Sequence, residues 1–134
     1  MAFTISIQKE FNTTPTFLLK LFRNSTIFRL TSANIIQADF EPNGKFHLTF
    51  ENRGIIYGRF LKIAEYEIEI DWNVEGFGRP EEKGTLLQVL LKESNDKCLL
   101  SLRHSGIILE ESAMAKEKSW KEILEEVERI TNNI

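Results

Sequence analysis

Hydrophobic and polar residues alternate along most of the middle of this sequence. The clearest case is residues 65–72, where Tyr66, Ile68, Ile70 and Trp72 occupy every second position and acidic residues lie between them. A period of two places successive side chains on opposite faces of a strand, so the apolar set is expected to face a core and the acids to face solvent. The same pattern predicts strands over residues 3–8, 35–40, 45–51, 55–63, 65–72, 85–93 and 97–104.

Three other segments have the spacing of helices. Residues 12–24 contain Thr14, a favourable N-cap, followed by Pro15, which suits a first helical position. Residues 25–32 are predicted to form a second short helix. A long helix is predicted from about Ser112, and Ser119 with Glu122 matches a capping box, which leaves a kink or a second start there open. Its apolar stripe consists of Trp120, Ile123, Leu124, Val127 and Ile130.

The order of these elements predicts an α+β fold. Consecutive strands with short links form an antiparallel sheet, here of about six or seven strands, with two short helices after the first strand. The long C-terminal helix must cover one face of that sheet. A curved sheet offers more concave surface than one helix fills, so a cavity is expected between them. The polar segment 73–84 is expected to form a mobile lid or rim over one end of this cavity.

Six short motifs, in order, carry a resemblance to a known family. They are FNTTPTFLLKLF, PNGKFHL, GRFLKI, IEIDW, CLLSLRHSGI and SWKEILEEV. With them the sequence resembles the helix-grip superfamily (START-like, SRPBCC, birch-pollen-allergen-like), and within it the family of the heat-shock protein 90 ATPase activator's C-terminal domain. It departs from the family at Asn43 and Ser119, which replace glycines, and by having Phe28 and Leu30 where a tryptophan is usual.

The resemblance implies a helix-grip fold for one START-like domain over residues 1–134. The full co-chaperone carries an additional N-terminal domain, for which 134 residues leave no room. The family therefore implies the fold more than it implies chaperone stimulation. Many single-domain relatives resemble binders of hydrophobic small molecules, and some superfamily members are cyclases or hydroxylating enzymes.

The residues expected to line the cavity are those on predicted inward positions. For any one of them, ordinary core packing is the alternative; together they have the mainly apolar composition of a ligand site. We expect Leu124→Trp to fill the cavity without unfolding the protein. The predicted lining comprises Phe46, Leu48, Phe50, Phe60, Tyr66, Ile68, Trp72, Leu100, Leu102, His104, Trp120 and Leu124.

His104 ends the last predicted strand, just before Gly106 and the long helix. Three roles are open: a structural hydrogen bond where the chain changes direction, a polar contact to a ligand, or acid–base catalysis. The structural role is favoured, because no serine, cysteine or carboxylate is placed as an evident partner. No catalytic residue is assigned.

Composition narrows the function classes. The net charge of −3 argues against nucleic acid, and no apolar run approaches the roughly 20 residues of a membrane span. The single cysteine, Cys98, allows no internal disulfide, and no residues have metal-ligand spacing, so neither a metal nor a cofactor is expected. The acidic positions of residues 65–71 read as a solvated outer face. A cytoplasmic location is expected, and the oligomeric state is left open.

Three functions follow as hypotheses. The first is a non-enzymatic module that binds a hydrophobic or lipid-like small molecule between the sheet and the C-terminal helix. The second is an interaction module with a chaperone as protein partner. The third is an enzyme of the cyclase or hydrolase kind, which would need a second polar group near His104.

Overall fold

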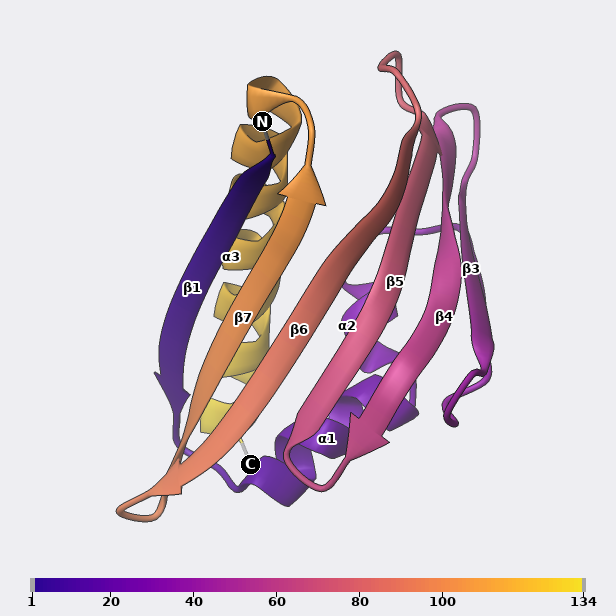
Figure 1. The fold of residues 1–134 in the computed structure, drawn as a ribbon. Coiled ribbons are helices and arrows are strands. Elements are labelled where there is room, and N and C mark those ends of the chain that lie inside the picture. Colours follow the sequence, from indigo (N-terminus) through magenta and orange to yellow (C-terminus); the bar gives the residue numbers. More distant parts are fainter. Residues whose placement is uncertain (1, 134) are drawn as a thin grey trace.

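The computed structural model describes residues 2–133 and contains one seven-stranded antiparallel sheet (Figure 1). Its strand order is β1-β7-β6-β5-β4-β3-β2, so the first and last strands of the chain are neighbours. The α+β helix-grip architecture is thereby confirmed. The strands are β1 (Phe3–Phe11), β2 (Ile35–Ala38), β3 (Lys45–Phe50), β4 (Gly54–Ala64), β5 (Glu67–Gly76), β6 (Glu82–Ser94) and β7 (Lys97–Ile107).

Two short helices follow β1, as predicted: α1 (Pro15–Arg23) and α2 (Thr26–Arg29). The Thr14 hydroxyl caps α1 by accepting a hydrogen bond from the Phe17 amide at 3.1 Å. The long helix α3 (Glu110–Asn132) begins two residues before Ser112 and runs unbroken through Ser119. The capping-box motif therefore starts no helix, because Ser119 already lies inside one.

Two glycine bulges shape one end of the sheet. Ile5 pairs with His104 and Phe3 with Ile107, so one residue of β1, Thr4, lies opposite two of β7, Ser105 and Gly106, and Gly106 has a φ of +82°. β7 thus continues past His104, where the sequence predicted its end. The bulge also turns both His104 and Ile107 inward, although a regular strand would place residues three apart on opposite faces.

β6 has a matching bulge at Gly84, whose φ is +72°. Trp72 pairs with Thr85 and Val74 with Glu82, so both Thr85 and Glu82 become buried on the inner face. As a consequence, the predicted lid of residues 73–84 is mostly strand: β5 extends to Gly76 and β6 begins at Glu82, leaving a turn of residues 77–81.

The helices share the concave face of the sheet unequally. In Figure 1, α3 lies behind β1 and β7, while α1 and α2 lie behind the lower part of the other strands. Phe28 of α2 stacks on Phe46 at 5.2 Å between ring centroids, and Phe40 meets Phe60 edge-on at 5.1 Å. These rings fill the space beneath α2, so any opening must lie between α2 and α3.

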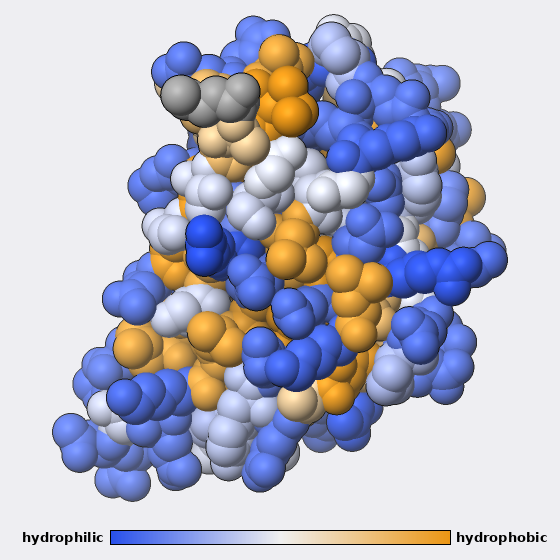
Figure 2. Space-filling view, viewed as in Figure 1, coloured by the Kyte–Doolittle hydropathy of each residue, from blue (hydrophilic) through white to orange (hydrophobic). Residues whose placement is uncertain are grey.

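The outer face of the sheet has charged and polar side chains interspersed with apolar ones (Figure 2). The predicted outward acids lie here: Glu67 pairs with Lys62 at 2.8 Å, and Asp71 accepts a hydrogen bond from Asn73 at 3.1 Å. Ile35, Leu61 and Leu90 are large apolar residues that this face leaves about half exposed.

Candidate ligand groove

A groove of about 550 Å³ runs along one side of α3. β3, β4 and β5, the turn after β5, the segment after α2, and α3 all contribute to it. Its volume lies within the range of about 300–1,000 Å³ found for small-molecule sites. Its walls are formed by Leu30, Thr31, Ser32, Phe50, Arg53, Ile56, Trp72, Val74, Phe77, Arg79, Ala115, Lys116, Ser119, Trp120, Glu122, Ile123, Glu125 and Glu126.

Aromatic rings form much of the apolar part of the groove. Trp72 of β5 and Trp120 of α3 lie 5.3 Å apart between ring centroids, and both are at most 4% exposed. Phe77, in the turn after β5, meets Phe50 edge-on at 5.2 Å. The sheet and the helix thus each contribute an aromatic surface against which an apolar molecule can pack.

The structure divides the predicted cavity residues into three groups. Phe50, Trp72 and Trp120 line the groove. Tyr66 was expected to face inward, and that expectation is wrong: it lies in the turn between β4 and β5 and is 41% exposed, since the alternation of β5 begins only at Glu67. The remaining residues are buried in the core outside the groove: Phe46, Leu48, Phe60, Ile68, Leu100, Leu102, His104 and Leu124.

Leu124 shows how the position of a residue around α3 decides whether its side chain lines the groove or is buried in the core. It is 3% exposed and buried in the core, while its neighbour Ile123 lies in the wall of the groove. One residue corresponds to about 100° around a helix, enough to separate these two directions. A tryptophan at position 124 would therefore overpack the core, and position 123 is the one that can block the groove.

His104 lies behind the groove, fully buried, in a chain of hydrogen bonds. The indole N–H of Trp120 donates to His104 Nδ1 at 3.3 Å, and an indole nitrogen can only donate. The neutral ring then carries its proton on Nε2, which donates to Thr85 Oγ1 at 2.9 Å. The Thr85 hydroxyl donates in turn to the backbone carbonyl of Trp72 at 2.5 Å. The indole nitrogen of Trp120, both ring nitrogens of His104 and the hydroxyl of Thr85 therefore all have hydrogen-bond partners.

This arrangement bears on the three roles that were left open for His104. Burial, and to a smaller extent the nearby Lys116 cation, lower the pKa of His104 from 6.5 to about 3. The ring is therefore neutral at physiological pH, with both nitrogens occupied by protein partners. Through these contacts His104 joins α3 to β5 and β6 beneath the floor of the groove, which supports the structural role.

Lys116 and Glu82 form a second connection between α3 and the sheet. Their side chains are only 11% and 6% exposed, and the Lys116 ammonium donates to Glu82 Oε1. Burial lowers the pKa of Lys116, while Glu82 acts in the opposite direction. The other carboxylate oxygen, Oε2, has no hydrogen-bond partner within residues 2–133.

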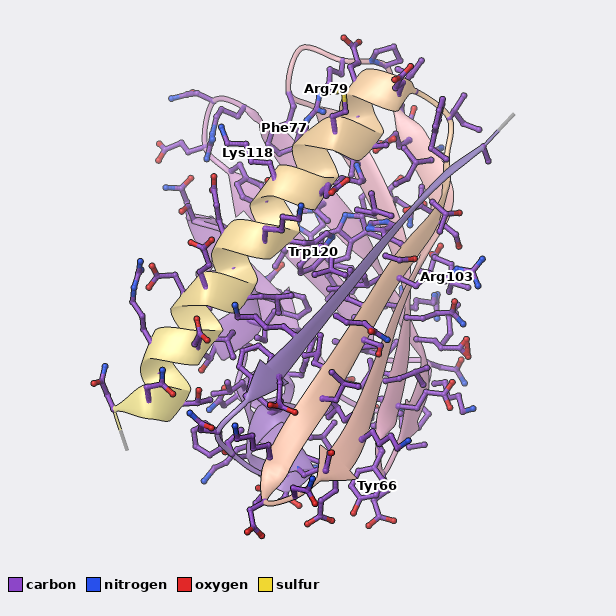
Figure 3. All side chains as sticks on the ribbon, turned by 90° about the vertical axis from the view of Figure 1, so that its left-hand side faces the viewer. Tyr66, Phe77, Arg79, Arg103, Lys118 and Trp120 are labelled. Atoms are coloured by element: carbon purple, nitrogen blue, oxygen red, sulfur yellow. The ribbon has the colours of Figure 1, made fainter. Side chains whose placement is uncertain are left out.

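Sequence reasoning missed the charged residues in the groove wall and Glu82, which lies beside it. Lys116 lies four residues before Trp120 and could have been found by extending the helical stripe one turn back. Glu82 could not have been found in this way, because the bulge at Gly84 turns its side chain inward, whereas regular alternation along β6 would point it outward. Arg79 lies in the turn that was expected to form the rim, and Figure 3 shows Phe77 and Arg79 beside the N-terminal half of α3.

The described part of the chain contains neither a membrane-spanning helix nor a cluster of metal ligands. No helix of residues 2–133 combines the length and hydropathy that crossing a bilayer requires. No group of three or more His, Cys, Asp or Glu side chains there is arranged to hold a metal ion.

Comparison with solved structures identifies the fold. The HSP90 activator PFC0360w from Plasmodium falciparum superposes with a TM-score of 0.63 at 24% identity, over 78% of this chain and 74% of that one. The Aha1 dimer from Colwellia psychrerythraea superposes with a TM-score of 0.78 at 15% identity, over 96% of each chain. Ara h 8.0201 superposes with a TM-score of 0.76 at 11% identity, over the full length of both chains. At these identities the likeness establishes the fold alone.

The family is established by sequence. No curated protein matches the chain closely enough to indicate kinship. The family described as Activator of Hsp90 ATPase homolog 1-like protein, however, matches residues 11–132, nearly the whole chain. The chain therefore belongs to the Activator of Hsp90 ATPase homolog 1-like family and has a START-like (SRPBCC) helix-grip fold.

Proposed function

We propose that this protein binds a small molecule with a large apolar part in the groove beside α3. The observation that carries the proposal is the pairing of Trp72 and Trp120 in the wall of a groove of about 550 Å³. Each 100 Å² of apolar surface removed from water contributes about 2.5 kcal/mol before the cost of association. Apolar burial against these rings is therefore the main source of affinity.

The proposed role is binding without chemistry. His104, the residue most suited to acid–base catalysis by type, is neutral and hydrogen-bonded on both ring nitrogens. Lys116, the most buried cation of the groove, is paired with Glu82. A group already committed to a protein partner is a poor general acid or base, because catalysis requires it to reach a substrate proton.

The first experiment is native mass spectrometry of gently purified protein, followed by titration with a panel of fatty acids, sterols and aromatic metabolites. The protein contains two tryptophans, Trp72 and Trp120, and both line the groove, so their fluorescence reports directly on its occupation. We expect an adduct, or a saturable change in emission, for at least one apolar ligand.

Ile123→Trp tests the location by placing an indole in the groove. It should remove the adduct while the far-ultraviolet circular dichroism stays unchanged. The matched control is Ile108→Trp, since Ile108 is 65% exposed and lies outside the groove. A folded Ile123→Trp variant with undiminished binding would place the ligand elsewhere and contradict the proposal.

A second candidate function is that of a chaperone-associated interaction module. Its support is the family itself and the likeness to the P. falciparum protein that is described as an HSP90 activator. A protein without bound or titratable ligand, but which binds purified Hsp90 and raises its ATPase rate, would favour this candidate over the first.

A further inference from the structure

The charged residues of the groove are sorted by sign along its length. Lys116, Arg79 and Arg53 come from three different elements, α3 and the turns after β5 and β3. Arg53 lies over the Phe50 ring, which contacts Phe77, and Lys116 lies near Arg79, so the three cations share the end of the groove at the Phe77 turn. The Phe77 amide donates to the Arg53 carbonyl at 2.7 Å, which brings these two turns together. The acids Glu122, Glu125 and Glu126 project instead from the following turns of α3.

The basic end holds more positive charge than the protein itself neutralises. Lys116 is paired with Glu82, and Arg79 lies close enough to Lys116 to lower its pKa. Within residues 2–133, Arg79 forms no ion pair, and neither does Arg53, whose guanidinium lies over the Phe50 ring at 5.5 Å. Arg53 is exposed and Arg79 is half-buried. A half-buried guanidinium without an anionic partner, such as that of Arg79, is a ready partner for a carboxylate, which it can hold through two parallel hydrogen bonds.

We propose that the ligand of this groove is an anionic amphiphile, a single apolar chain or ring system that ends in a carboxylate. The apolar part packs against the adjoining rings of Trp72 and Trp120 in the groove wall, and the carboxylate meets Arg79 at the basic end. This inference rests on the proposed function and adds the charge and the orientation of the ligand. The acids on α3 contribute to it by disfavouring the reversed orientation, because they would face the carboxylate.

Arg79 is the residue to change in the test. Lys116 is unsuitable, since its loss would leave the buried Glu82 carboxylate unpaired and could unfold the protein. Arg79→Gln removes the charge from a turn residue that forms no ion pair in the described part of the chain. The matched control is Arg103→Gln, which removes the same charge from an exposed position on the outer face, as Figure 3 shows.

The experiment compares three probes of equal chain length by calorimetry and tryptophan fluorescence: decanoate, decanol and decylammonium. We expect wild-type protein to bind decanoate roughly tenfold more tightly than decanol, the gain typical of one charge-assisted hydrogen-bonded pair, and decylammonium least tightly. Arg79→Gln should lose the preference for decanoate while its affinity for decanol is retained. Arg103→Gln should behave as wild type.

Two results would overturn the inference, and they differ in what they leave standing. Equal affinity of the wild-type protein for decanoate and decanol, or an undiminished preference in Arg79→Gln, would reject the anionic ligand but keep an apolar-binding groove. Failure of all three probes to bind would reject the single-chain amphiphile and would count against the proposed function as well.

Discussion

A hydrogen-bonded connection joins Trp120, His104 and Thr85, and the donor and acceptor of each bond in it follow from the chemistry of the groups. The indole must donate, so the imidazole must accept on Nδ1, and the threonine then receives the Nε2 proton. Leaving any of these buried groups unpaired costs about 1–3 kcal/mol. The connection thus fixes the rotation of α3 about its own axis, and with it the direction in which Trp120 faces the groove.

The protonation of His104 makes stability depend on pH. Its folded pKa of about 3 lies below its ordinary value of 6.5, so the unfolded chain binds the proton more readily. This contribution is complete above about pH 6.5 and is lost as the pH falls from there towards 3. We expect the free energy of unfolding to fall by about 1–2 kcal/mol between pH 7 and pH 5 from this group alone.

Urea denaturation as a function of pH measures this loss, and NMR of the His104 ring identifies its source. The ring carbon and proton shifts should stay constant down to pH 5. A ring that titrates with a midpoint above pH 6 would contradict the neutral, doubly bonded imidazole.

At the scale of elements, glycines serve two different purposes in this sheet. Gly106 supplies a left-handed backbone at the bulge, and a Cβ there would meet nothing closer than 3.6 Å. Gly58 of β4 instead lies between Phe46 and Trp72 in the register of three strands, and a Cβ there would lie 1.7 Å from the Asp71 carbonyl oxygen. Position 106 requires a residue that tolerates positive φ, and position 58 requires a residue without a Cβ.

Substitutions should separate these two requirements. Gly106→Ala is expected to cost about 1–2 kcal/mol through backbone strain, and Gly106→Asn less, since asparagine tolerates positive φ. Gly58→Ala is expected to cost about 3 kcal/mol or more because two strands must move apart, and Gly58→Asn should be no better. Urea denaturation measures all four; rescue by asparagine at position 58 would show that conformation, not space, governs that site.

The Lys116–Glu82 pair ties α3 to β6 and gives an element-scale prediction of its own. Lys116→Met leaves a buried, unpaired carboxylate and is expected to cost about 3–5 kcal/mol. The double variant Glu82→Leu with Lys116→Met removes both charges and should recover most of this loss. A double-mutant cycle in urea gives the coupling free energy. Additive effects of the two substitutions would mean that the charges do not interact in solution.

At the scale of the whole molecule, the groove results from incomplete coverage of the sheet. α3 packs mainly against β1, at one edge, while α1 and α2 cover the other strands near one end. Between α2 and α3 the inner faces of β3, β4 and β5 remain open, and the Phe77 turn closes the space at the far end. The cavity expected from a sheet larger than its helix is present, but it lies beside α3 and is only partly lined by the residues predicted for it.

The sequence by itself determined the elements, their order and the faces they bury. Alternation over residues 65–72 identified the inward residues of β5 from Ile68 onward, and the spacing from Trp120 to Val127 identified the buried stripe of α3. These features are local, because a period of two or of 3.6 is a property of one segment. The order of six motifs was sufficient for the family as well.

Only the tertiary structure decided which buried residues face the groove. Phe46 and Phe60 have the same inward pattern as Phe50, yet the first two are covered by Phe28 and Phe40, which arrive from other segments. Glu82 becomes buried because one additional residue at Gly84 shifts the register of β6. Periodicity assigns a residue to a face, but which element covers that face depends on contacts between segments distant in the sequence.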